Sequence, residues 1–146
     1  MNPLRITRVK VAKAPFTLEV TWTTGNVDCI DLTPSIRARR GLAALRDAAT
    51  FRAVTVGEGG HSLTWPGDLD IGADRLHELA LEQAGRVDAV TLTRWRQRHG
   101  LTQIAAADAL GISRRMLGYY ESGAKPVPKA ITLACIGWES IRSRAA

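Results

Sequence analysis

A short segment near the end of the chain, residues 114–120, combines two adjacent arginines with a glycine and two tyrosines. At 100° per residue, Met116, Leu117 and Tyr120 fall on one side of a helix formed by this segment. The opposite side carries the residues that could contact a ligand: Arg114, Arg115, Gly118 and Tyr119. Guanidinium groups donate paired hydrogen bonds to phosphate or to the O6 and N7 atoms of guanine. The pattern therefore predicts a helix that buries apolar side chains and presents arginines to a nucleic acid.

Two helices joined by a tight turn would position this surface. Thr102 is a suitable N-terminal cap for a helix that Gly111 would end. Ser113 would cap the next helix, which we expect to span Ser113–Glu121. The stretch from residue 90 to residue 98 has helical spacing as well. Helices joined across a glycine in this way indicate helix-turn-helix geometry.

The positive charge of the chain is concentrated in its C-terminal part. The net charge is +6; residues 1–86 contribute 11 Lys and Arg against 10 Asp and Glu, whereas residues 87–146 contribute 9 against 4. A basic excess confined to one part suggests a polyanionic partner, because phosphate contacts supply the non-specific part of nucleic-acid affinity. The alternative is a charge that serves solubility alone.

The motif that carries a family resemblance is Gly100-Leu101-Thr102-Gln103, Ala107, Gly111-Ile112-Ser113, Leu117 and Tyr120-Glu121-Ser122-Gly123. With this spacing, the stretch of roughly residues 90–142 resembles the lambda-repressor-like (Cro/C1, XRE) helix-turn-helix family. The resemblance implies an all-α domain that reads double-stranded DNA in the major groove. It also implies a homodimer, because this class usually reads two half-sites.

The same resemblance implies roles for individual residues. Base edges would be contacted by Arg114, Arg115, Gly118 and Tyr119, and DNA phosphates by Gln103, Ser113, Ser122 and Lys125. Arg96 and Glu121 resemble a pair that the family uses as a partly buried ion pair. The alternatives are structural: Ser113 as a helix cap alone, Tyr119 packed on the next helix, and Gln103 and the two arginines as solvated side chains.

Two apolar features could serve assembly. Ile104 and Ala105 stand where the family usually has polar residues, so they could form an interface with the N-terminal unit or with a second protomer. After Pro128, which suits a first helical turn, apolar residues recur at helical spacing from Ile131 to Ile141. This pattern is typical of a core helix, although its far end could form a dimer seam.

The first half of the chain has the pattern of strands and turns. The expected strands are Ile6–Val11, Thr17–Trp22, Val27–Asp31, Phe51–Val56 and Ser62–Trp65. We expect Thr33-Pro34-Ser35 to end the first hairpin, a short helical stretch over Ala38–Ala49, and a loop over Asp68–Gly72. Asp74–Gln83 has the spacing of an amphipathic helix.

The chain is therefore expected to be an α+β protein of two parts. Residues 1–84 would form a small α+β domain with two β-hairpins and a helix, residues 85–89 a linker, and residues 90–146 the all-α helix-turn-helix domain. Scattered apolar and turn positions between residues 17 and 79, among them Gly25, Trp65-Pro66 and Leu76, are similar to a bacterial domain-of-unknown-function family, number 2442. That resemblance implies a compact α+β fold and no established chemistry.

No residue pattern indicates an enzyme or a cofactor. His77-Glu78 begins like a metalloprotease motif, but Leu81 stands where the second histidine would be. Cys29 and Cys135 form no CxxC pair, which excludes a cysteine-type zinc site, and we expect both to be small core residues. No metal is expected either. The chain lacks a signal peptide and a membrane span, so we expect a soluble cytoplasmic protein.

The function that these features predict is sequence-specific binding of double-stranded DNA, in a homodimeric regulator of transcription. Two rivals remain open. An antitoxin-like protein would bind a partner protein through its N-terminal domain and use DNA binding to regulate its own operon; an exposed apolar patch on residues 1–84 would favour this reading. In the other, the helix-turn-helix no longer binds DNA and serves protein contacts.

Overall fold

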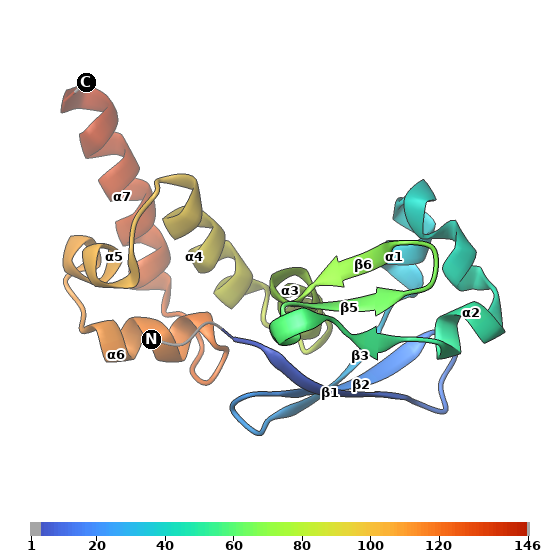
Figure 1. Ribbon diagram of the computed structural model, residues 1–146. Helices are drawn as coiled ribbons and strands as arrows, with labels where there is room; N and C mark the ends of the chain where they lie inside the picture. The colour runs from blue at the N-terminus through green and yellow to red at the C-terminus, as the bar shows by residue number, and fades with distance from the viewer. Residues whose placement is uncertain (1–3, 146) are drawn as a thin grey trace. The chain divides into compact units, whose positions relative to one another are not determined.

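The computed structural model describes residues 4–145, and the chain divides into two compact units, residues 1–83 and 84–146. The first unit contains strands and helices, whereas the second is entirely helical in the part that the structure describes (Figure 1). The expected α+β fold class is confirmed. No helix found between residues 4 and 145 has the length and apolar character that crossing a membrane requires.

The first unit begins with an antiparallel three-stranded sheet, β1 (Ile6–Val11), β2 (Thr17–Trp22) and β3 (Val27–Asp31), in that order. Leu18, Val20 and Trp22 are buried on one face of β2, while the residues between them are partly exposed. This alternation is the signature of a half-buried strand, which is why the bounds of all three strands agree with those expected from the sequence.

The second sheet contains a strand that the sequence analysis missed. β4 (Thr55–Val56) pairs with β5 (Ser62–Trp65), and β5 pairs with β6 (Leu69–Gly72). The loop expected over residues 68–72 is therefore wrong. Gly67 and Asp68, with φ of +87° and +59°, reverse the chain directly after β5, which places Ile71 opposite Leu63 in the core.

The stretch between the two sheets is more helical than expected. It forms α1 (Thr33–Ala38), a 3-10 helix η1 (Arg40–Arg46) and α2 (Ala48–Arg52). Pro34 lies in the first turn of α1, where proline needs no hydrogen-bond partner, so Thr33-Pro34-Ser35 begins a helix instead of only ending the hairpin. The Asp47 carboxylate accepts a 3.0 Å hydrogen bond from the Thr50 backbone N–H, which caps α2 and lowers the pKa of Asp47.

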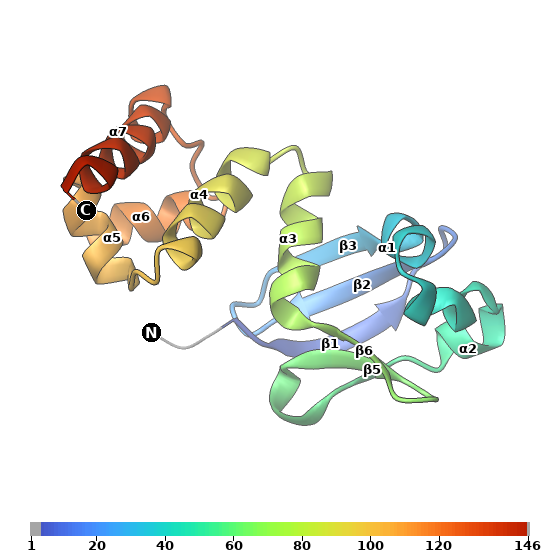
Figure 2. The ribbon, with the colours of Figure 1, turned by 90° about the horizontal axis from the view of Figure 1, so that it is seen from above.

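The strand expected over Phe51–Val56 is shorter than predicted. Phe51 belongs to α2, and only Thr55 and Val56 pair with β5. The short 3-10 helix η2 (Glu58–Gly60) joins β4 to β5. The two sheets and α3 (Ala73–Gln83), which runs beside β3 (Figure 2), enclose one core. Its fully buried side chains include Leu18, Ile30, Leu32, Leu45, Leu63 and Leu76.

Two residues of the first unit depart from ordinary expectation. Phe16 has φ of +52°, a conformation that costs a bulky residue about 1–3 kcal/mol. Its carbonyl accepts a 2.8 Å hydrogen bond from the Leu32 N–H, and its ring packs edge-on against Phe51 at 5.6 Å. Cys29 is exposed on β3, which corrects the expectation that both cysteines lie in the core; its neighbours in the sequence are apolar, but its side chain points to the outer face.

The second unit consists of α4 (Val87–Arg98), α5 (Gln103–Leu110), α6 (Arg114–Glu121) and α7 (Lys129–Ala145). The α4 helix begins inside the stretch expected to be a linker. The core of the second unit is formed by Leu92, Trp95, Ala106, Ala107, Leu110, Leu117, Tyr120 and Cys135. The apolar spacing of α7 leaves this core after Trp138, because Ile141 is 72% exposed.

Candidate nucleic-acid interface

The α6 helix is held on the domain by its cap and its buried side. The Ser113 hydroxyl accepts a 3.1 Å hydrogen bond from the Met116 N–H, and Leu117 and Tyr120 are buried while Met116 is half-buried. On the preceding helix, the Thr102 hydroxyl accepts a hydrogen bond of the same length from the Ala105 N–H. Both helices therefore begin where their sequences predict, and they bury the side chains that their sequences predict.

The turn between α5 and α6 depends on one glycine. Gly111 has φ of +71°, the left-handed conformation that ends a helix and that glycine adopts without strain. Ala106 and Ala107 are almost completely buried, and such small side chains let the two helices approach each other closely. This geometry fixes where the outer side of α6 faces.

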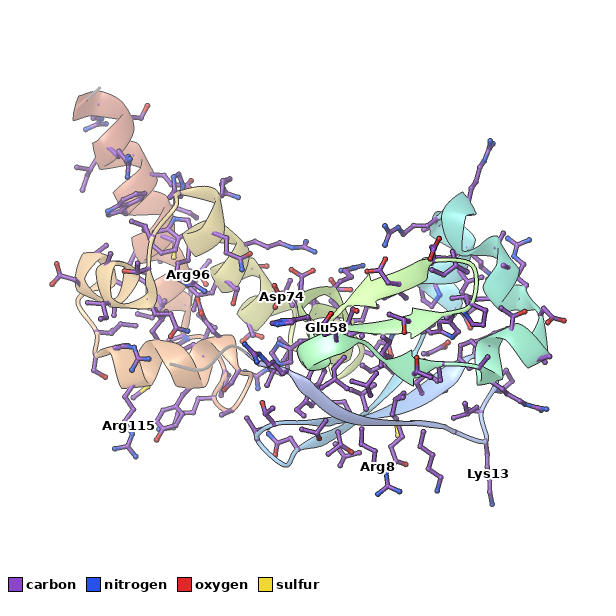
Figure 3. The ribbon with its side chains drawn as sticks, viewed as in Figure 1. Arg8, Lys13, Glu58, Asp74, Arg96 and Arg115 are labelled. Carbon is purple, nitrogen blue, oxygen red and sulfur yellow. The ribbon has the colours of Figure 1, made fainter. Side chains whose placement is uncertain are left out.

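The outer side of α6 carries two exposed arginines. The Arg115 Nε donates a 2.7 Å hydrogen bond to the Tyr119 hydroxyl, and its guanidinium lies 5.5 Å from the centre of the Tyr119 ring. In Figure 3 the Arg115 side chain points away from the helices, while Arg96 lies among them. The Arg114 side chain is exposed and has no hydrogen bond or ion pair to any other residue in the described stretch 4–145. Neither guanidinium is covered by the chain's own fold.

A third cation belongs to the same surface. The Lys125 Nζ lies 5.0 Å from the centre of the Tyr119 ring, on the loop that follows α6. Tyr119 thus contacts both Lys125 and Arg115, which gathers their charges around one aromatic side chain. Glu121 is the single acidic residue of α6, and it is buried in an ion pair. The exposed surface around α6 is therefore positive, and we call Arg114, Arg115, Tyr119 and Lys125 the basic face.

Gly118 leaves open space on the basic face. A Cβ atom added at this position would meet no protein atom within 4 Å. The packing of the domain therefore does not require a glycine there, although glycine weakens a helix by up to about 1 kcal/mol relative to alanine.

Beneath α6 lies a partly buried polar network. The Arg96 Nε donates to a Glu121 oxygen at 2.7 Å, with 17% and 7% of the two side chains exposed. Arg96 also donates to the Leu101 carbonyl at 3.1 Å, and the Gln103 side-chain N–H donates to the second Glu121 oxygen at 2.9 Å. The network joins α4, α5 and α6, so these residues hold the three helices in place.

The residues expected to contact phosphates differ in which donors remain available. The Ser113 oxygen accepts in the helix cap, which leaves its O–H free to donate. The Ser122 O–H donates instead to the Tyr119 carbonyl at 3.2 Å, so a phosphate would have to compete with this bond. Gln103 uses one side-chain N–H in the polar network, and its backbone N–H lies in the first turn of α5.

Asp88 is a positioning residue that the sequence analysis did not single out. Its carboxylate accepts a 2.8 Å hydrogen bond from the Val127 N–H and pairs with Arg86 at 3.3 Å. Burial alone would raise the pKa of Asp88, but the N–H groups of Val127 and Ala89 and the Arg86 charge outweigh it and lower that pKa. Asp88 thus ties the start of α4 to the loop that carries Lys125. The sequence signal that could have identified Asp88 is an acidic residue in the first turn of a helix.

The acidic and histidine residues of the first unit do not form a metal site. Within the described residues, no group of three or more His, Cys, Asp and Glu side chains is placed to hold a metal ion. His77 packs edge-on against Trp22 at 5.6 Å. Its partial burial lowers the pKa of its imidazole, against the opposing influence of nearby carboxylates.

Comparison with known proteins agrees with this architecture. Residues 92–134 match the family described as helix-turn-helix, and residues 6–82 match the family described as protein of unknown function (DUF2442). No curated protein matches the chain. A protein of Nitrosomonas europaea ATCC 19718, whose crystal structure bears the name "Putative DNA Binding Protein", is 38% identical; the match covers 97% of this chain and 92% of that one, with a TM-score of 0.71. Since the second family covers more than half of the chain, the protein belongs to the DUF2442 family and carries a helix-turn-helix domain at its C-terminal end.

Proposed function

We propose that this protein binds double-stranded DNA with α6 in the major groove and regulates transcription. The observation that carries the proposal is the basic face, whose arginines are exposed while Leu117 and Tyr120 anchor the helix. The helix-turn-helix match and the name of the Nitrosomonas protein support it. In this proposal the protein acts in the cytoplasm and by binding DNA, without a catalytic step.

The basic face would read bases as follows. Arg114 and Arg115 reach the base edges, where a bidentate contact to guanine discriminates by about 1–3 kcal/mol. Gly118 lets the helix backbone approach the groove floor, and the Tyr119 ring contacts the bases beside it. The Lys125 ammonium, the Ser113 O–H, Ser122 and the backbone N–H of Gln103 face phosphates, as helix N-termini and lysines commonly do.

The test is selection of bound sequences from a random duplex pool, followed by affinity measurements on the selected site. Arg114→Ala and Arg115→Ala should each lower the preference for the selected site over random duplex. Lys125→Ala should weaken all sequences alike and reduce the slope of log affinity against log salt by about 1. Arg8→Ala, at an exposed arginine of β1 in the first unit, is the matched loss of charge and should change the preference least.

Equal losses on selected and random duplexes for both arginine variants would remove them from base reading. Failure to recover any enriched sequence, with affinity that depends on salt alone, would reduce the proposal to non-specific binding.

We also propose that the protein acts as a homodimer through α7. Leu133, Ile136 and Ile141 on this helix are all more than half exposed, and Ile136 borders a groove of about 460 Å³ between α4 and α7. Exposed apolar clusters mark protein contacts, and two-fold symmetry suits a domain class that reads paired half-sites. Ile104 on α5, 68% exposed, is a second apolar position that assembly could cover.

The antitoxin-like rival gains less from the structure. An N-terminal unit that binds a partner through an apolar patch should expose several large apolar side chains. Between residues 4 and 83, Val27 is the one that is exposed. The feature of this unit that is suited to a ligand is a cavity lined by two arginines, not an apolar patch.

A further inference from the structure

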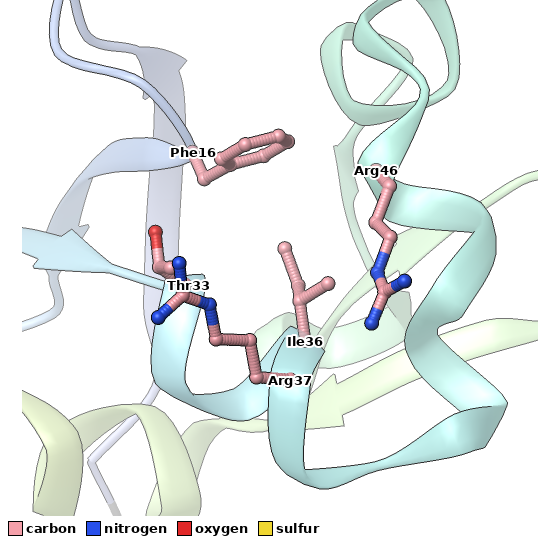
Figure 4. Close-up of a pocket in the computed structure, with 5 residues that line it drawn as sticks. All are labelled: Phe16, Thr33, Ile36, Arg37 and Arg46. Carbon is pink, nitrogen blue, oxygen red and sulfur yellow. The ribbon is translucent and has the colours of Figure 1, made fainter.

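The first unit contains a cavity that the DNA-binding surface does not involve. It has a volume of about 420 Å³ and is lined by Phe16, Thr33, Ile36, Arg37 and Arg46. In the view of Figure 4, the Phe16 ring faces Ile36 across the space, Arg46 stands on one side, and Thr33 and the Arg37 guanidinium stand on the other. The volume lies within the range of about 300–1,000 Å³ that small-molecule sites occupy.

Both arginines of the cavity lack a counter-ion. Their side chains are exposed and form no ion pair with any residue that the structure describes. Asp47, next to Arg46 in the sequence, directs one carboxylate oxygen, Oδ2, to the N–H and hydroxyl of Thr50 and forms no ion pair with Arg46. Residues 33–52 contain five arginines and this single acidic residue. A cation pair on an excess of positive charge favours an anionic ligand.

Phe16 and Ile36 give the cavity two apolar walls that are firmly held. Ile36 is 4% exposed and belongs to the core of the unit, so it forms a fixed wall. Phe16 keeps its positive φ because its carbonyl bonds to Leu32 and its ring packs on Phe51. A bulky residue in that conformation is uncommon and is often found where a ligand is bound.

We propose that this cavity binds a carboxylate that is attached to an apolar group. The two exposed guanidiniums stand on opposite sides of the space and would close on the carboxylate, while Phe16 and Ile36 would cover the apolar part. A phosphodiester backbone fits less well, because its sugar and phosphate groups would lose their own hydration against the apolar walls and find no hydrogen-bond partner there. The ligand could be a free organic acid or the carboxyl terminus of a peptide with an apolar last residue. The inference concerns the first unit alone and holds whether or not the second unit binds DNA.

The experiment is a titration of the full chain, followed by backbone amide NMR, with 4-phenylbutyrate and with its uncharged amide. The carboxylate should shift amides of residues 16 and 33–46 in a saturable manner, and the amide should bind at least about tenfold more weakly. Two peptides ending in Leu-Phe, one with a free and one with an amidated carboxyl terminus, repeat the comparison. Tighter binding of the free-ended peptide than of phenylbutyrate would identify a peptide as the source, and the reverse order a free acid.

Variants locate the site. Arg37→Gln and Arg46→Gln keep most of each side chain and should each weaken carboxylate binding at least about tenfold. Arg52→Gln is the matched control, because Arg52 is exposed on α2 and does not line the cavity; it should leave binding unchanged. Unchanged amide spectra away from the cavity would show that each variant is folded.

Three results would overturn the proposal. These are equal binding of acid and amide, an equal loss in the Arg52 control, or no saturable binding of either acid or peptide. A loss of affinity for duplex DNA in the Arg37 and Arg46 variants, without carboxylate binding, would assign the two arginines to phosphate contacts instead.

Discussion

Individual side chains of the basic face differ in how far the sequence predicts them. The side of α6 on which Arg114 and Arg115 lie follows from helical spacing alone. The bond from Arg115 to the Tyr119 hydroxyl does not, because either side chain could have been solvated. The sequence did not predict that the Gln103 side chain donates to Glu121; a buried carboxylate requires more donors than Arg96 supplies.

At Gly118, the fold and the proposed ligand should respond in opposite directions. Gly118→Ala should stabilise the protein by up to about 1 kcal/mol, because the helix gains propensity and the new Cβ meets no protein atom. The same methyl group should weaken DNA binding if the groove floor lies against the backbone. Urea unfolding and DNA titration measure the two effects.

Gly137→Ala is the control for this pair of measurements. Gly137 is also helical, on α7, and its added Cβ would likewise have nothing within 4 Å. This variant should gain stability without losing affinity for a duplex that carries a single half-site, because that affinity does not depend on the contact proposed for α7. Unaltered DNA affinity in Gly118→Ala would show that the backbone at residue 118 is not close to the DNA.

The ion pair between Arg96 and Glu121 should contribute to stability mainly through what its loss leaves behind. Glu121→Ala would strand the Arg96 guanidinium in a mostly buried position, and such a change costs about 3–5 kcal/mol. The double variant Arg96→Met, Glu121→Leu should recover much of that loss, since no buried charge remains. Denaturant unfolding of the single and double variants tests this. A loss below about 1 kcal/mol in the single variant would show that water solvates the pair.

At the scale of elements, strands and helices were predicted correctly where the side-chain pattern or the capping residues define them. They were missed where the conformation of a turn determines the path of the chain. Strict alternation in β2 fixed the first sheet, and capping residues fixed α5 and α6. The strand β6 was missed because Asp68 adopts a left-handed conformation that its residue type alone does not reveal. The helical stretch from α1 to α2 was misplaced because its pieces are short and are separated by η1, so no clear helical period develops.

The tie between α4 and the loop after α6 should make the second unit sensitive to acid. Because the folded pKa of Asp88 lies below its usual 3.8, the carboxylate adds stability above that pH and loses it as the pH falls through the lower, folded value. Asp88→Asn should therefore destabilise the unit at neutral pH, and the difference from the wild type should shrink below about pH 4.

Thermal unfolding of both proteins between neutral and acidic pH measures this difference. Glu139→Gln is a useful comparison, because the pKa of Glu139 is also lowered, by bonds from His99 and Arg98, while its carboxylate does not contact the loop that carries Lys125. Of these two variants, only Asp88→Asn should also weaken DNA binding at neutral pH. A pH-independent gap between wild type and Asp88→Asn would mean that the charge of Asp88 has no role in the tie.

For the whole molecule, the apolar side chains exposed on α7 should determine its oligomeric state. Ile141→Glu should convert a homodimer to a monomer in sedimentation, because burying an unpaired carboxylate in an apolar contact is strongly unfavourable. Sedimentation of Ile104→Glu tests in the same way whether the apolar patch on α5 contributes to the dimer. Val27→Glu, at an exposed apolar residue of β3 in the first unit, makes the same kind of change outside α7. A monomer mass in all four proteins, the wild type included, would exclude the dimer.

The bond between Arg115 and Tyr119 has a consequence for how recognition proceeds. A free arginine side chain loses conformational entropy worth roughly 2 kcal/mol when a base immobilises it. Here one hydroxyl already restricts that freedom before any nucleic acid arrives. For the proposed contact with bases, the Arg115 side chain is thus preorganised, so discrimination between bases would depend on a geometry set during folding and less on adjustment at the moment of contact.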